Sequence, residues 1–155
     1  MENQSVMERL IAKNITIATA ESCTGGLIAS EITKVPGSSS VFGYGMVTYS
    51  NEAKKKILGV KEATLEAHGA VSSETAYEMA AGLKELSGAE VAVSVTGIAG
   101  PGGGSAEKPV GLVYMGIAYG DAVDTRKNLF HGDRDAIRRE TVATALQWVA
   151  EKLGL

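Results

Sequence analysis

Residues 20–26 combine reactive side chains with glycines at a predicted change from strand to helix. The side chains are those of Glu21, Ser22, Cys23 and Thr24, and Gly25 and Gly26 follow them. The first N–H groups of a helix lack partners and attract negative charge, so they can hold an oxyanion or a phosphate. Ser22 is therefore either a nucleophile beside N–H donors around Thr24 and Gly25, or a helix cap.

A serine nucleophile needs a base, and the sequence offers lysine in preference to histidine. His68 is explained by a helix end near Gly69, and His131 by an exposed position before GDRD. Lys54 follows a predicted strand and begins a helix, and a lysine that is partly buried can lose its proton near neutral pH. It also lies in a run of three lysines, which is typical of a solvated face. Both interpretations of Lys54 remain open.

Cys23 is the competing nucleophile, because a helix N-terminus favours a thiolate. With no histidine evidently paired to it, we favour a small buried side chain. It is the only cysteine, so no internal disulfide or cysteine-rich zinc site is expected. No tight cluster of His, Asp and Glu is visible either, and we expect neither a metal nor a cofactor.

Two further segments supply groups for an anionic ligand. The glycine-rich stretch TGIAGPGGGS lacks both the P-loop and the Rossmann pattern, and it is either a pocket wall or a plain surface loop. The wall would contain Thr96, Gly97, Gly100, Gly102 and Gly103. Three arginines begin the last predicted helix and either contact a phosphate or pair with neighbouring carboxylates; they are Arg134, Arg138 and Arg139.

Hydrophobic periodicity predicts the elements that position these groups. Helices are expected near 6–11, from about 25 to before Pro36, after Ser50, after 72–73 and from about 133. On the buried side of the fourth we expect Ala76, Met79, Ala80, Leu83 and Leu86. Strands are expected at 15–20, 41–50, 90–97, 110–120 and 122–130, with a hairpin at Gly120. Early alternation and a late hairpin predict an α/β fold, a three-layer α/β/α sandwich around a mixed sheet.

Length and charge limit the classes of function. A chain of 155 residues is expected to be one domain, residues 1–155. Its net charge of −3 argues against broad capture of nucleic acid or of an anionic membrane. The start of the chain lacks a signal-peptide core and no apolar run could span a bilayer, so we expect a cytoplasmic protein.

Six short motifs identify a family resemblance. They are AESCTGG (20–26), VTYSNEAK (47–54), HGAVS (68–72), TGIAGPGGGS (96–105), EKPVG (107–111) and GDRDAIRR (132–139). In this order they resemble the CinA C-terminal domain family, the nicotinamide-nucleotide amidases, over nearly the whole chain and with no departure at the motif positions. Longer relatives carry an additional N-terminal domain, so the resemblance implies the stand-alone form.

The resemblance implies hydrolysis of the carboxamide of nicotinamide mononucleotide through a Ser-Lys acyl-enzyme, with Ser22, Lys54 and Tyr49 as catalytic candidates. Tyr49 would orient Lys54 or relay a proton, or would simply be a packed tyrosine. Glu21 would position Lys54 or a ribose hydroxyl, or would complement the helix N-terminus. A homo-oligomer with a small nucleotide substrate is expected. The alternative is a module that binds a nucleotide without turnover, as a regulatory or competence-associated protein.

Overall fold

The computed structural model describes residues 2–155, which form six α-helices, one short 3₁₀-helix and five strands. In chain order these are α1 (Glu2–Lys13), β1 (Ile17–Glu21), α2 (Leu27–Thr33), η1 (Ser38–Ser40), β2 (Phe42–Val47), α3 (Asn51–Leu58), α4 (Glu62–His68), α5 (Ser73–Ser87), β3 (Val91–Gly97), β4 (Leu112–Tyr119), β5 (Ala122–Leu129) and α6 (Arg134–Leu153).

The strands form one mixed sheet in the order β2-β1-β3-β4-β5. β1 pairs in parallel with both β2 and β3, and the β4–β5 hairpin adds antiparallel to β3. β1 is buried along its whole length, as expected for a strand that is covered on both faces. The mixed sheet and the hairpin predicted from the sequence are confirmed.

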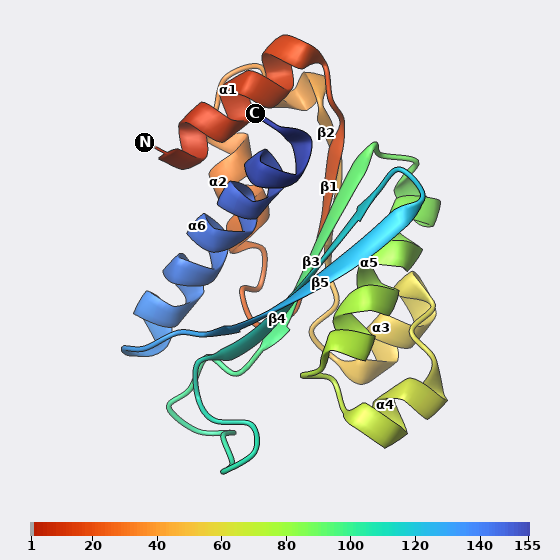
Figure 1. Cartoon of the computed structure of the whole chain (residues 1–155), viewed down its shortest axis with the longest axis vertical. Helices are drawn as coiled ribbons and strands as arrows, with labels where there is room; N and C mark the ends of the chain where they lie inside the picture. The colour runs from red at the N-terminus through yellow and green to blue at the C-terminus, as the bar shows by residue number, and fades with distance from the viewer. Residues whose placement is uncertain (1) are drawn as a thin grey trace.

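Helices cover both faces of the sheet, which confirms the three-layer sandwich. Figure 1 shows α1, α2 and α6 on one face and α3, α4 and α5 on the other. Each face buries its own apolar cluster, one including Leu10, Ile28 and Leu146, the other Leu58, Met79 and Leu83. The sheet is therefore a rigid base for residues at its edge.

The carboxyl ends of the three parallel strands meet at one edge of the sheet. Glu21, the last residue of β1, is in register with Val47 of β2 and Val95 of β3. The segments that follow these strands are therefore brought together, which is where open α/β sheets usually bind ligands. They are the first motif, the stretch leading to α3, and the glycine-rich loop.

Three details differ from the sequence prediction. α2 begins at Leu27, because Gly25 and Gly26 take φ values of 58° and 104°, which a right-handed helix excludes. Leu86 is 47% exposed, whereas the other four residues expected on the buried side of α5 are buried. The segment before His68 forms a helix of its own, α4. Across residues 2–155 we find no helix with the length and apolar character to cross a membrane.

Candidate active site

Ser22 and Lys54 meet at the carboxyl edge of the sheet. Ser22 follows β1 directly, and Lys54 lies on α3, whose start is fixed by the Ser50 side chain accepting the N–H of Ala53. Lys54 Nζ is 3.0 Å from Ser22 Oγ, in an interior contact between residues 32 positions apart. The lysine side chain is only 1% exposed. The fold thus holds a hydroxyl against a buried amine.

The surroundings of Lys54 favour its neutral form. Besides the serine, Nζ contacts the carbonyl oxygens of Thr48 at 2.9 Å and Tyr49 at 3.2 Å. Within residues 2–155 no carboxylate forms an ion pair with it. Burial lowers the pKa of Lys54, because an ammonium group loses its hydration in the interior. A neutral amine has two N–H groups for the carbonyls and one lone pair for the serine hydroxyl.

The lysine run divides between the interior and the surface. Lys54 is buried, whereas Lys55 forms an ion pair with Glu62 and Lys56 is exposed. The periodicity of α3 explains this, because successive helical residues point in directions about 100° apart. The solvated-face interpretation therefore describes Lys55 and Lys56 but not Lys54.

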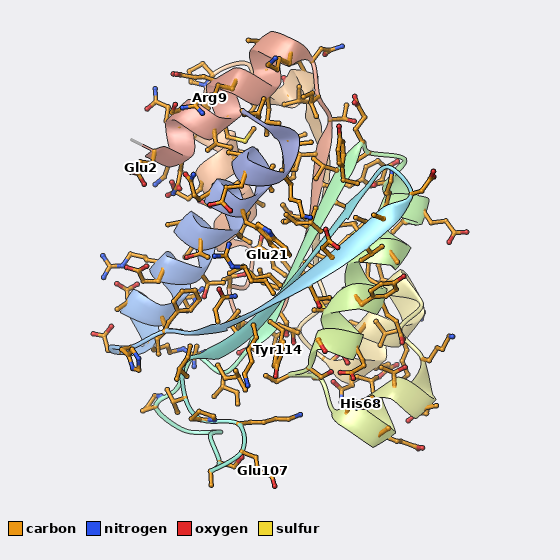
Figure 2. All side chains as sticks on the ribbon, in the orientation of Figure 1. Glu2, Arg9, Glu21, His68, Glu107 and Tyr114 are labelled. Atoms are coloured by element: carbon orange, nitrogen blue, oxygen red, sulfur yellow. The ribbon has the colours of Figure 1, made fainter. Side chains whose placement is uncertain are left out.

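Glu21 binds the start of α2 and makes no hydrogen bond to Lys54. Its Oε1 accepts from Thr24 Oγ1 at 2.5 Å and from Ile28 N at 2.8 Å, and its Oε2 accepts from Ala29 N at 3.1 Å. Figure 2 shows Glu21 in the interior, between the sheet and the helices. Of the roles expected for Glu21, the structure contains the interaction with the helix N-terminus. The first N–H groups of α2 are consequently occupied.

The main-chain N–H groups next to Ser22 that could serve an oxyanion belong to the turn between β1 and α2. The N–H of Gly25, which the sequence predicts as an oxyanion donor, donates instead to the Ser22 carbonyl at 3.1 Å and is not available. Among the residues described, the N–H groups of Cys23 and Thr24 have no backbone acceptor. Cys23 follows the serine directly, which is where hydrolases with a nucleophile on a sharp turn take one oxyanion donor.

The side chains beside Ser22 are poor competing nucleophiles. Cys23 is buried, and desolvation raises the pKa of its thiol to about 12. It is therefore a neutral thiol at physiological pH. Thr24 is fully buried and its hydroxyl is bonded to Glu21. Ser22 is the hydroxyl that contacts a base.

A cavity of about 230 Å³ opens at the Ser22–Lys54 pair. Its lining consists of Ser22, Cys23, Tyr49, Asn51, Lys54, Ala70, Val71, Thr96, Gly97, Ala99 and Arg134. This lining contains the guanidinium of Arg134 and no carboxylate, in a chain of net charge −3. The local charge favours an anionic ligand. Sequence reasoning missed Asn51, Ala70, Val71 and Ala99, although all lie within or beside the recognised motifs.

Tyr49 contributes its main chain to Lys54 and its side chain to the cavity rim. The phenol is 61% exposed, and its hydroxyl accepts from Arg134 Nη2 at 3.4 Å. Arg134 Nη1 also donates to the Gly100 carbonyl at 2.7 Å. The carbonyl oxygen of Tyr49 contacts Lys54 Nζ, whereas its hydroxyl faces Arg134, and a side chain this exposed is not the packed tyrosine of the alternative interpretation.

The glycine-rich loop contributes its base to the cavity. Thr96 and Gly97 line it, and Thr96 Oγ1 donates to the Ala70 carbonyl at 2.9 Å. Gly100 contacts Arg134 through its carbonyl. Gly102 and Gly103 are exposed and do not line the cavity. Gly26, which is half-buried, does not line it either. Figure 2 places Glu107 at the far end of this loop, away from the body of the domain.

Arg138 lies outside the Ser22 cavity, contrary to the expected substrate contact. Its Nη2 donates to the Thr24 carbonyl at 2.9 Å, and it lines a larger cavity of about 640 Å³ between α2 and α6. That cavity contains no serine, threonine or cysteine, and ion pairs at 2.6 Å (Lys34–Glu31) and 3.1 Å (Arg139–Asp135) neutralise much of its charge. We take the smaller cavity as the site, because it holds the nucleophile and its base.

The two histidines and Lys108 lie away from Ser22. His68 ends α4, 3.5 Å from Glu74, and His131 lines the larger cavity, so neither approaches Ser22. Lys108 Nζ donates to the His68 carbonyl at 2.5 Å. Across residues 2–155 no three His, Cys, Asp or Glu side chains are arranged to hold a metal ion.

Comparison with known proteins gives consistent matches. The model of the CinA C-terminal domain matches residues 2–153. A protein of Clostridium novyi, provisionally named competence-damage inducible protein, is 56% identical over 144 residues, which is 93% of this chain and 35% of that protein. One of Caldanaerobacter subterraneus is 53% identical over 153 residues, 98% of this chain and 37% of that protein. The chain therefore spans about a third of the length of these relatives.

Two solved structures match the whole fold. A competence/damage inducible protein from Agrobacterium tumefaciens has a TM-score of 0.93 and 45% identity, covering 97% of this chain and 95% of that one. A competence damage-inducible protein from Klebsiella pneumoniae has a TM-score of 0.94 and 36% identity, covering 99% and 96%.

Proposed function

The chain belongs to the CinA C-terminal domain family, and from that membership and the buried Ser22–Lys54 pair we propose that it is a nicotinamide-nucleotide amidase. It hydrolyses nicotinamide mononucleotide to nicotinate mononucleotide and ammonia. The observation that supports this best is the 3.0 Å contact between Lys54 Nζ and Ser22 Oγ. A protein that only binds a nucleotide has no need of a nucleophile paired with a desolvated base.

The proposed reaction begins with acylation. Ser22 Oγ attacks the amide carbon while neutral Lys54 takes the hydroxyl proton. The negative charge on the substrate oxygen is held by main-chain N–H groups beside Ser22, those of Cys23 and Thr24. Lys54, now protonated, donates its proton to the leaving nitrogen, and ammonia departs. The product of this step is an ester between Ser22 and the nicotinoyl group.

Deacylation uses the same groups in the reverse sense. A water attacks the ester carbon, neutral Lys54 takes its proton, and the proton returns to Ser22 Oγ as the C–O bond breaks. Nicotinate mononucleotide is released and the free pair is restored.

Arg134 is the proposed contact for the substrate phosphate. It lines the same cavity as Ser22, and no carboxylate neutralises it in an ion pair within residues 2–155. Its guanidinium is held at the rim by Gly100 and Tyr49. A planar guanidinium can bind a phosphate through two parallel N–H bonds. On this basis the amide lies at Ser22 and the phosphate near the rim.

The test of the proposed activity is release of ammonia from nicotinamide mononucleotide. We expect ammonia and nicotinate mononucleotide in equal amounts, with the rate unchanged in EDTA, because lysine and main-chain donors carry the chemistry. Ammonia is measured by an enzyme-coupled assay and the nucleotides by chromatography. Loss of activity in EDTA that a divalent cation restores would refute the Ser-Lys mechanism. A nucleotide that binds without turnover would identify the binding module instead.

We also propose that the chain is a homo-oligomer. β2 is an edge strand of the sheet, and Tyr44 and Val47 on it are 44% and 49% exposed. Edge strands with exposed apolar side chains are surfaces at which a second chain can pack. Sedimentation velocity measures the mass directly, and we expect at least twice the 16.1 kDa of one chain. A single species of monomer mass would contradict the proposal.

A further inference from the structure

A chain of hydrogen bonds connects Arg138 to the residue after the proposed nucleophile. Arg138 Nη2 donates to the carbonyl of Thr24 at 2.9 Å. The peptide group formed by that carbonyl carries the N–H of Gly25, which donates to the carbonyl of Ser22 at 3.1 Å. The Ser22 carbonyl and the N–H of Cys23 belong to one peptide group. Two consecutive hydrogen bonds thus separate a guanidinium on α6 from this N–H.

The geometry of the peptide group allows an effect at Arg138 to pass along these hydrogen bonds to the Cys23 N–H. In a trans peptide the carbonyl and the N–H point to opposite sides, so fixing one fixes the other. Gly25 has a φ of 58°, which glycine adopts readily, but a glycine loses more conformational freedom on folding than any other residue, so contacts from outside the turn help to hold it. A bond from α6, which is 114 residues further along the sequence, supplies such a contact.

Arg138 is well placed to polarise the chain as well as to hold it. It is half-buried, and among residues 2–155 it forms no ion pair with a carboxylate. Its Nε is buried and has no hydrogen-bond acceptor. No direct ion pair therefore holds the guanidinium, and a hydrogen-bond donor with a charge polarises the bonds that follow it.

We propose that Arg138 is a positioning residue, which through the peptide groups of Thr24 and Ser22 orients and strengthens the N–H of Cys23 as an oxyanion donor. This inference rests on the proposed amidase function. It assigns Arg138 to the transition state and not to the substrate phosphate, which Arg134 contacts. The two arginines, four residues apart on α6, thus act at different steps.

The kinetic consequences of the two roles differ. A donor to the oxyanion acts mainly in the transition state, so Arg138→Met should lower kcat about tenfold and leave KM almost unchanged. Loss of a whole oxyanion donor costs roughly a hundredfold or more, and weakening one should cost less. The same loss should appear with nicotinamide riboside, which lacks the phosphate. Arg134→Met should instead raise KM for the nucleotide and leave the riboside unaffected.

A direct readout uses the fact that Cys23 is the only cysteine. Protein labelled with ¹⁵N in cysteine alone gives a single amide signal, which reports on the Cys23 N–H without any substrate. We expect this signal to move in Arg138→Met and to return partly in Arg138→Lys, which keeps the charge. Arg9→Met is the matched control, because Arg9 is exposed on α1 and donates to Ser5, and its spectrum should be that of the wild type.

The outcomes separate this inference from the proposed function. A Cys23 signal that does not move in Arg138→Met overturns the inference, whatever the protein catalyses. If the Cys23 signal moves in Arg138→Met but the wild type has no amidase activity, the proposed function is refuted and the hydrogen-bond connection from Arg138 to Cys23 is supported. A rise in KM for the nucleotide alone would make Arg138 a phosphate ligand. The pH profile of the variants should match the wild type, because Lys54 is untouched, and thermal unfolding checks that each variant is folded.

Discussion

Ser22→Ala is expected to lower ammonia release from nicotinamide mononucleotide at least about a thousandfold, because the variant has no group to form the acyl-enzyme. The neighbours cannot replace it. The pKa of the Cys23 thiol is raised to about 12 by burial, and the Thr24 hydroxyl is bonded to Glu21. The rate is measured under saturating substrate, so that a change in binding does not contribute.

Ser30→Ala is the matched control, since Ser30 is an exposed serine on α2, outside the Ser22 cavity. It should keep the wild-type rate. The Ser22 variant should remain folded and still bind the nucleotide. Mass spectrometry of quenched wild-type reactions should find the acyl group of nicotinate mononucleotide, with its ribose phosphate, on the peptide that contains residue 22. If Ser22→Ala kept the full rate, Ser22 would have a structural role, and Cys23 or Thr24 would be the next candidates for the nucleophile.

The order of elements was predictable because local patterns determine it. The short β-forming runs of β1 and β3, the spacing in α5 and the glycine at position 120 each reflect a local rule of propensity, periodicity or turn geometry. The start of α2 was misplaced, since sequence periodicity does not report the positive φ of Gly25 and Gly26. Leu86 was misplaced because an apolar residue near a helix end can fit the pattern and still face solvent.

The site was predictable in its composition but not in its connections. The strand-to-helix corner pointed to Ser22 and an anion, and the motif resemblance pointed to Lys54. Nothing local could show which lysine of the run is buried, because that depends on how α3 packs on the sheet. The hydrogen-bond partners of Glu21 and Arg138 could not be predicted either. Arg138, for example, bonds to Thr24, which is 114 residues away in the sequence.

The second large effect concerns Lys54, which we expect to act as the base only in its neutral form. Lys54→Met removes the amine and should lower kcat by roughly 10²- to 10⁴-fold, the usual contribution of a general base. Lys54→Arg should be as inactive, because a guanidinium does not lose its proton in a protein. Lys55→Met is the control, since Lys55 pairs with Glu62 outside the cavity and its loss should leave the rate unchanged.

The sign of the pH dependence follows from the direction of the pKa shift. Burial lowers the pKa of Lys54 from 10.5, so the neutral base appears as the pH rises through the lowered value. The wild-type kcat/KM should therefore increase with pH and reach its plateau at a lower pH than a lysine with the ordinary pKa of 10.5 would give. A rate that rises only near the ordinary pKa of lysine would contradict a desolvated base.

Stability should report the same shift without any substrate. Between the lowered pKa and 10.5 the unfolded chain binds a proton at Lys54 that the folded chain does not, so wild-type stability should rise with pH across this window. Lys54→Met has no such group, and its melting temperature relative to the wild type should be highest below this window and fall across it. Parallel pH profiles of the two proteins would mean that Lys54 keeps its ordinary pKa when folded. Lys54 would then contact Ser22 Oγ as an ammonium group, and another residue would have to act as the base.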